Sequence, residues 1–167
     1  MTNEAVNWEM WSAIGTVGAT VVALCLALRD SWRLRRDRKA QGNLWGNVFA
    51  MQYRDRLGPA LERWIEEADR LERHEGHPDR YARIAIELED AAKWPSHEDL
   101  SRLLVPLPAA AEHFAVARNV IEEASRTCAR AAGEQANPDH RRFLMEQVRE
   151  SLKSARLHGE WGFDACR

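Results

Sequence analysis

The chain has 167 residues and a formal net charge of −2, with 24 Lys and Arg against 26 Asp and Glu. The two excess acidic residues precede the first basic one, so the charges balance from Arg29 onward, which excludes the basic surface of a nucleic-acid-binding protein. Three cysteines are an odd number and predict no disulfide framework in a chain whose bulk we place in a reducing compartment.

An uncharged run of nineteen residues extends from Met10 to Leu28. As a helix it would span about 28 Å, close to the thickness of the hydrocarbon core of a bilayer. A helix buried in a soluble protein normally keeps a polar face, and this one has none. Trp8 and Trp11 at one end and Trp32 at the other are placed as interfacial anchors. The run therefore predicts a single transmembrane helix over residues 10–28.

All of the basic residues lie on one side of this run, from Arg29 onward. Because basic residues beside an apolar helix resist translocation, we predict that residues 1–9 are extracytoplasmic and that the rest is cytoplasmic, in a bacterial inner membrane. The acidic N-terminus also argues against a cleaved signal peptide. Recognition of anionic lipid headgroups is the alternative role for the basic residues, and Asp30 and Asp37 weaken it. The basic residues next to the span belong to a predicted basic juxtamembrane helix over residues 29–42. They are Arg29, Arg33, Arg35, Arg36, Arg38 and Lys39.

Small residues recur at four-residue intervals within the predicted span, at Gly15, Ala19, Ala23 and Ala27. This spacing places them on one face of a helix, where small side chains let a second backbone approach closely. The stripe predicts a homo-oligomer that pairs through the anchor. The alternative is that glycine and alanine are simply frequent in transmembrane helices.

The apolar run follows the pattern W-x-x-x-G-T-x-G-A, then Val, Ala and Leu, then Arg-Asp, and its fixed members are Trp11, Gly15, Thr16, Gly18, Ala19, Arg29 and Asp30. This pattern resembles the N-terminal anchors of small, uncharacterised bacterial single-pass inner-membrane proteins. The resemblance covers about residues 8–30. It implies an inner-membrane location and a cytoplasmic domain, and it transfers no functional site.

Residues 43–167 show the periodicity of amphipathic helices and lack the alternation typical of strands. Apolar residues recur every three or four positions, most regularly from Phe114 through Ile121 to Cys128. We therefore predict an all-α fold, in which a single N-terminal transmembrane helix is followed by a cytoplasmic helical bundle. The predicted helices of the bundle cover residues 43–57, 59–75, 79–94, 97–104, 109–132 and 138–158.

Glycine, proline and capping residues between the apolar stripes predict the helix ends. Asn137 precedes a proline and is a start signal, because its side-chain oxygen accepts a hydrogen bond from a free amide and the proline has no amide to satisfy. Ser96 with Asp99 resembles a capping box. Gly58 and Gly159 are expected to lie where helices end.

The sequence contains no assembled catalytic, cofactor-binding or metal-binding pattern. His74 and His77 are three residues apart, whereas the helical zinc motif needs four, and Gly76 lies between them. His113 has no nucleophile or acid pattern around it. Glu87 and its acidic neighbours are interpreted as a solvated flank of their helix. We therefore expect neither an enzyme nor a bound cofactor.

Two large aromatic residues, Trp161 and Phe163, follow the last predicted helix. They either fold back onto the bundle or dock a protein partner, since aromatic side chains dominate interface hot spots. Folding back is favoured because exposed apolar patches are rare. The expected acceptor surface consists of Trp45, Phe49, Trp64 and Trp94.

Three functional hypotheses follow. The leading one is a membrane-anchored helical interaction protein, adaptor or sensor-like and non-enzymatic, whose partners are the lipid bilayer and an unidentified protein. The alternative is a membrane-acting effector of a defence or lysis system that works through oligomerisation of the anchor. The third is an enzyme whose site is dispersed between helices.

Overall fold

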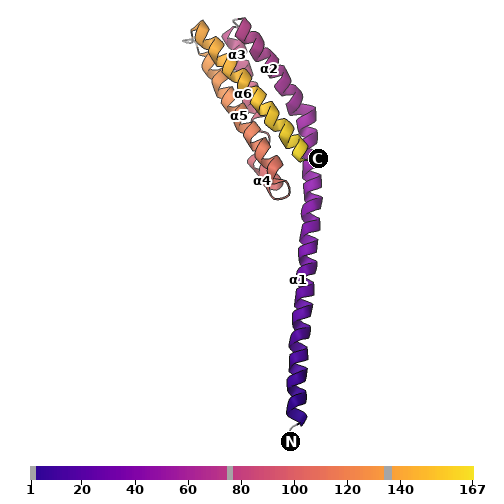
Figure 1. Cartoon of the computed structure of the whole chain (residues 1–167). Helices are drawn as coiled ribbons and strands as arrows, with labels where there is room; N and C mark the ends of the chain where they lie inside the picture. The colour runs from indigo at the N-terminus through magenta and orange to yellow at the C-terminus, as the bar shows by residue number, and fades with distance from the viewer. Residues whose placement is uncertain (1–2, 75–76, 134–136) are drawn as a thin grey trace. The chain divides into compact units, whose positions relative to one another are not determined.

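The computed structural model describes the backbone of residues 3–74, 77–133 and 137–167, and the side chains of these ranges from residue 16 onward. These ranges form helices and no strand, which confirms the predicted all-α fold (Figure 1). The chain divides into two compact units, Met1–Ala40 and Gln41–Arg167. Its elements are α1 (Asn3–Gln52), the π-helical turn η1 (Tyr53–Leu57), α2 (Gly58–Arg73), α3 (Pro78–Ala91), α4 (His97–Leu104), α5 (Pro108–Ala132) and α6 (Pro138–Ala165).

The first unit is the N-terminal part of α1, and its large apolar side chains from Val17 to Leu34 are each more than half exposed. Among the described residues, no helix is both long and apolar enough to cross a membrane. The predicted span begins at Met10, and the side chains of residues 10–15 lie outside the described residues. The transmembrane helix over residues 10–28 is therefore not supported by the described residues and stays a prediction.

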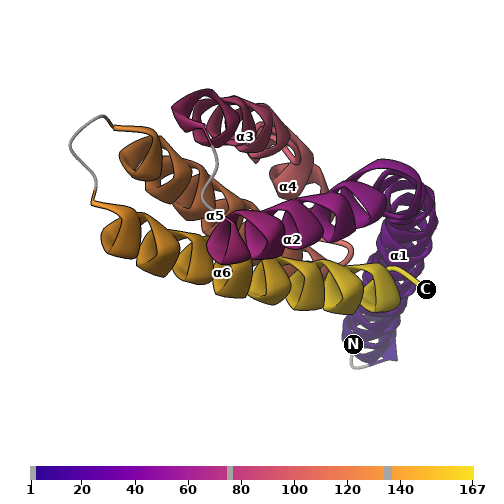
Figure 2. The same ribbon diagram turned by 90° about the horizontal axis from the view of Figure 1, so that it is seen from above.

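In the second unit, α2, α3, α5 and α6 form a helical bundle in which successive long helices run in opposite directions (Figure 1). Backbone packing joins α5 to both α3 and α6, and it joins α2 to α6, while the short α4 packs on α5. Helix packing thus closes three sides of the bundle. The fourth side lies between α2 and α3 (Figure 2).

The core forms because each helix of the bundle turns one apolar stripe inward. Phe114 is fully buried, and its ring centroid lies 5.5 Å from that of Phe49, 6.1 Å from that of Tyr53 and 5.7 Å from that of Trp94. Cys128 follows on the same stripe of α5, and burial raises the pKa of its thiol to about 12. The predicted core stripe of this helix is confirmed.

Both predicted capping sites are confirmed. The Asn137 side-chain oxygen accepts a hydrogen bond from the backbone N–H of Asp139 at 2.8 Å. The Ser96 hydroxyl accepts from the N–H of Asp99 at 3.1 Å, and the Asp99 carboxylate accepts from the N–H of Ser96 at 3.1 Å. These bonds satisfy amides that the first turn of a helix leaves free, and they fix where α4 and α6 begin.

Two predicted helix ends are wrong, at Gly58 and Gly159. The helix continues through Gly58 as a π-helical turn, in which the Gly58 N–H donates to the carbonyl of Tyr53, and the wider turn accommodates the proline that follows. Gly159 lies inside α6 and not at its end. A Cβ atom there would lie 2.3 Å from the Tyr53 ring, so this glycine serves close helix packing.

Candidate functional site

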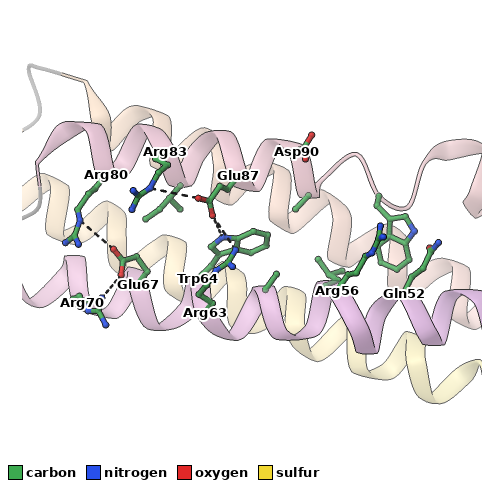
Figure 3. Close-up of a pocket in the computed structure, with 15 residues that line it drawn as sticks. Gln52, Arg56, Arg63, Trp64, Glu67, Arg70, Arg80, Arg83, Glu87 and Asp90 are labelled. Atoms are coloured by element: carbon green, nitrogen blue, oxygen red, sulfur yellow. Dashed lines mark hydrogen bonds and ion pairs between the residues drawn. The ribbon is translucent and has the colours of Figure 1, made fainter.

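A groove with a volume of about 790 Å³ lies on the side of the bundle between α2 and α3 (Figure 3). Its lining comes from the end of α1, from η1, from α2 and α3, and from the segment that follows α3. Side chains of the two long helices point toward one another across it. Cavities of this size are typical of ligand-binding sites.

Apolar side chains form part of the lining. Trp64 lies near the middle of the groove and is only 5% exposed, and Leu57 and Ile84 are also buried. Ala60 and Ala91 line the groove from opposite helices. Because alanine side chains are short, they leave a gap that larger residues would fill.

Two glutamates hold arginines along the groove. Glu67 on α2 accepts a hydrogen bond from Arg70 at 3.0 Å and forms an ion pair across the groove with Arg80 of α3, with a nitrogen–oxygen distance of 3.9 Å. Glu87 on α3 forms an ion pair with Arg83, one turn earlier on the same helix, at 4.0 Å. The longer distances describe loose pairs rather than tight bidentate ones.

Glu87 also ties α3 to α2. Its carboxylate accepts a hydrogen bond from the indole N–H of Trp64 at 2.9 Å and forms an ion pair with Arg63 at 3.5 Å. The Glu87 side chain is 41% exposed, so it lies on a solvated flank as predicted, but the indole donor and the guanidinium also draw its carboxylate over the groove. Glu89 and Asp90 are exposed, as predicted.

Arginine is the commonest charged residue of the lining, with five arginines against three acidic side chains. Arg56, Arg63 and Arg70 are each separated by seven residues, and Figure 3 shows them in sequence along one side of the groove. Within the described part of the chain, no ion pair involves Arg56. A guanidinium carries five N–H donors, so the groove keeps donors and positive charge for an anionic ligand.

Among the described residues, no group of three or more His, Cys, Asp or Glu side chains is placed to hold a metal ion. The lining combines apolar side chains with five arginines and three carboxylates. Such a lining can recognise the shape and charge of a bound molecule.

The two aromatic residues predicted as a docking element lie within the last turns of α6. Phe163 is partly buried, with its ring centroid 6.0 Å from that of Tyr53, so it folds back onto the bundle, although on a residue outside the expected acceptor surface. Trp161 remains 44% exposed and lies beside the rings of His113 and His158, at 5.4 and 5.1 Å. A partner at Trp161 stays a prediction.

The residues predicted to pair anchors lie on α1. Ala19, Ala23 and Ala27 are exposed, and the surroundings of Gly15 lie outside the described residues. The six basic residues of the predicted juxtamembrane helix are exposed as well. Pairing through the small residues and contact of the basic residues with lipid both stay predictions.

The groove is not predicted from the sequence, because the sequence patterns place Trp64 in an acceptor surface for the C-terminal aromatic residues and Glu87 on a solvated flank. A signal was present in the spacing of Arg56, Arg63 and Arg70, which repeats every seven residues beside the apolar stripe of α2. Comparisons with protein-family models, with curated proteins and with solved structures find no match to this chain.

Proposed function

We propose that the protein is a membrane-anchored helical interaction module, adaptor or sensor-like, that acts by binding a protein partner rather than by catalysis. Residues 10–28 would form the anchor, with residues 1–9 outside the cell and the bundle at the cytoplasmic face of a bacterial inner membrane. The tether would raise the local concentration of whatever the bundle binds.

The exposure of apolar side chains on opposite faces of α1 carries this proposal. At about 100° per residue, Val21, Leu24 and Leu28 lie along one face, and Val22 and Leu26 lie on nearly the opposite face. All five are more than half exposed. A helix that is apolar all round is typical of a membrane span or of a large core.

A local hydrogen bond in the same segment supports the proposal. The Thr20 hydroxyl donates to the carbonyl oxygen of Thr16 at 2.9 Å. A threonine bonded in this way needs no water to satisfy its hydroxyl, which suits a hydrocarbon environment. The side chains described within the span, from residue 16 to 28, cover about 20 Å, and the proposal rests on the longer uncharged run from Met10.

Membrane extraction tests the proposal. The full chain expressed in bacteria should stay with membranes during alkaline carbonate extraction, and the double variant Val22→Asp, Leu24→Asp should be released, because each Asp costs about 3 kcal/mol at the centre of a span. The matched control is Leu44→Asp, Met51→Asp, which changes equally exposed apolar residues of α1 outside the span and should remain membrane-bound.

Topology is tested with reporters fused after Arg167. A cytoplasm-active reporter should work, and a periplasm-active one should stay inactive. Release of the unaltered chain by carbonate, or activity of the periplasmic reporter, would contradict the proposal.

A further inference from the structure

We infer that the groove between α2 and α3 binds an acidic amphipathic helix of a protein partner, with partner carboxylates along the row of arginines formed by Arg56 of η1 and Arg63 and Arg70 of α2. This inference rests on the proposed function, because it specifies what the interaction module would bind. It follows from three properties of the groove, which are its open position in the bundle, its length and the arrangement of its charges.

The first property is the side of the bundle on which the groove lies. Backbone packing closes the sides between α5 and α6, α3 and α5, and α2 and α6. Between α2 and α3 the links are made by side chains, through the Trp64–Glu87 hydrogen bond and the Glu67–Arg80 ion pair. Amphipathic helices of partners commonly lie in apolar grooves between helices in this way.

The second property is length. The lining runs along one side from Gln52 to Arg70, which corresponds to about 27 Å, and along the other from Arg80 to the end of α3 at Ala91, which corresponds to about 16 Å and is extended by Trp94 beyond the helix. These lengths match a partner helix of about 11 to 18 residues. Ala60, Ala91 and Trp94 are only partly buried and provide apolar surface between the two charged sides, above the buried Trp64 and Ile84.

The third property, the arrangement of charge, distinguishes a helix from a compact anion. A phosphate or a single carboxylate is bound best by donors that converge on one point. Arg56, Arg63 and Arg70 instead form a row with a repeat of seven residues, or about 10.5 Å. A partner helix with Asp or Glu at every seventh position has the same repeat, so its carboxylates would meet one arginine after another.

These arginines are free to make such contacts. The side chains of Arg63 and Arg70 are 68% and 61% exposed, and each pairs with a glutamate through one nitrogen. Arg56 is exposed and has no ion pair in the described part of the chain. A partner carboxylate can therefore bind the open side of each guanidinium while the internal ion pairs persist.

A synthetic peptide tests the inference on the full chain in detergent micelles. The probe is a fluorescein-labelled helical peptide of about 21 residues with Leu and Ala on one face and Glu at every seventh position beside them. The matched peptide carries Gln in place of each Glu. Fluorescence anisotropy should show binding of the Glu peptide that is about tenfold tighter or more, and this preference should shrink as salt is raised. Equal binding of both peptides, or binding of neither, would overturn the inference.

Variants in which arginine is replaced by the uncharged glutamine show where the peptide binds on the chain. The triple variant Arg56→Gln, Arg63→Gln, Arg70→Gln should weaken binding of the Glu peptide about tenfold or more. The matched control removes three exposed arginines from the first unit and should change binding less than about twofold; it consists of Arg33→Gln, Arg35→Gln and Arg36→Gln. Equal losses in the two triple variants would place the peptide on general basic surface and overturn the inference.

Two further measurements distinguish a loss of peptide binding from a loss of folding and from a failure of the membrane anchor. Arg56→Gln alone breaks no described ion pair, so it should leave the melting temperature unchanged and still weaken binding about threefold. Unchanged binding by this folded variant would count against the row of arginines. Carbonate extraction of the groove variants, Arg56→Gln and the triple variant Arg56→Gln, Arg63→Gln, Arg70→Gln, should give the same result as for the parent chain, so failure of the groove and failure of the membrane anchor are distinguishable.

Discussion

Two regions of this chain contain the same apolar residue types in different surroundings. In the first unit Leu24 is 60% exposed and Trp32 is 73% exposed, whereas in the second Leu61 is fully buried and Trp64 nearly so. The difference follows from spacing. Apolar residues every three or four positions give each bundle helix one apolar face, which the other helices of the chain cover, while residues 16–28 are apolar or small on every side. Under the proposed function, lipid would cover the second kind of helix.

The largest effect expected from this contrast is the loss of Phe114. Phe114→Ala should lower the free energy of unfolding of the bundle by about 3–5 kcal/mol, because it leaves a cavity between Phe49, Tyr53 and Trp94. Urea denaturation of the full chain in a mild detergent, followed by tryptophan fluorescence, measures this change.

The control for Phe114→Ala comes from the first unit. Leu24→Ala also removes an apolar side chain, but it should change the free energy of unfolding of the bundle by less than about 0.5 kcal/mol. A comparable loss of stability in both variants would show that the two regions are not different in the way proposed here.

Most of the bundle could be predicted from the sequence, because its signals are local. The stripe around Ile121 predicted a core helix, and the capping residues Ser96 and Asn137 marked where α4 and α6 begin. Each of these features depends on neighbours within one or two turns. Local hydrogen bonding and periodicity therefore sufficed.

The features that could not be predicted depend on contacts between distant segments. Gly159 has the sequence signature of a helix end, and its role in packing depends on Tyr53, which lies more than a hundred residues away. The groove likewise depends on Trp64 and Glu87 meeting across two helices. A one-dimensional pattern gives the apolar face of a helix but cannot show which residue lies opposite it.

The next largest effect is expected at Gly159. Gly159→Ala should lower the free energy of unfolding by about 1–2 kcal/mol, because the added methyl group would overlap the Tyr53 ring and this overpacking outweighs the better helix propensity of alanine. The ring has little freedom to move, since the Tyr53 hydroxyl donates to the carbonyl of Arg156 at 3.1 Å. The same urea titration measures the loss.

Gly18→Ala compares the packing around a glycine of the first unit with the packing around Gly159 in the second. A Cβ atom at Gly18 would meet no atom within 4 Å, so alanine there should be neutral or slightly stabilising for its helix. A destabilised Gly18→Ala variant beside an unaffected Gly159→Ala variant would reverse the assignment of which region is closely packed.

The smallest effect is expected at the stripe of small residues in the first unit. A second copy of the chain would pack against this stripe if the anchors pair. Ala19→Leu should weaken self-association of the anchor by about 1 kcal/mol, because its larger side chain keeps a second backbone from close approach. Val22→Leu is the matched substitution, since it enlarges an exposed residue away from the Ala19, Ala23 and Ala27 face and should change association little. An association assay within a bacterial membrane measures both. Equal association of the two variants would leave lipid, rather than a paired helix, as the surroundings of that face.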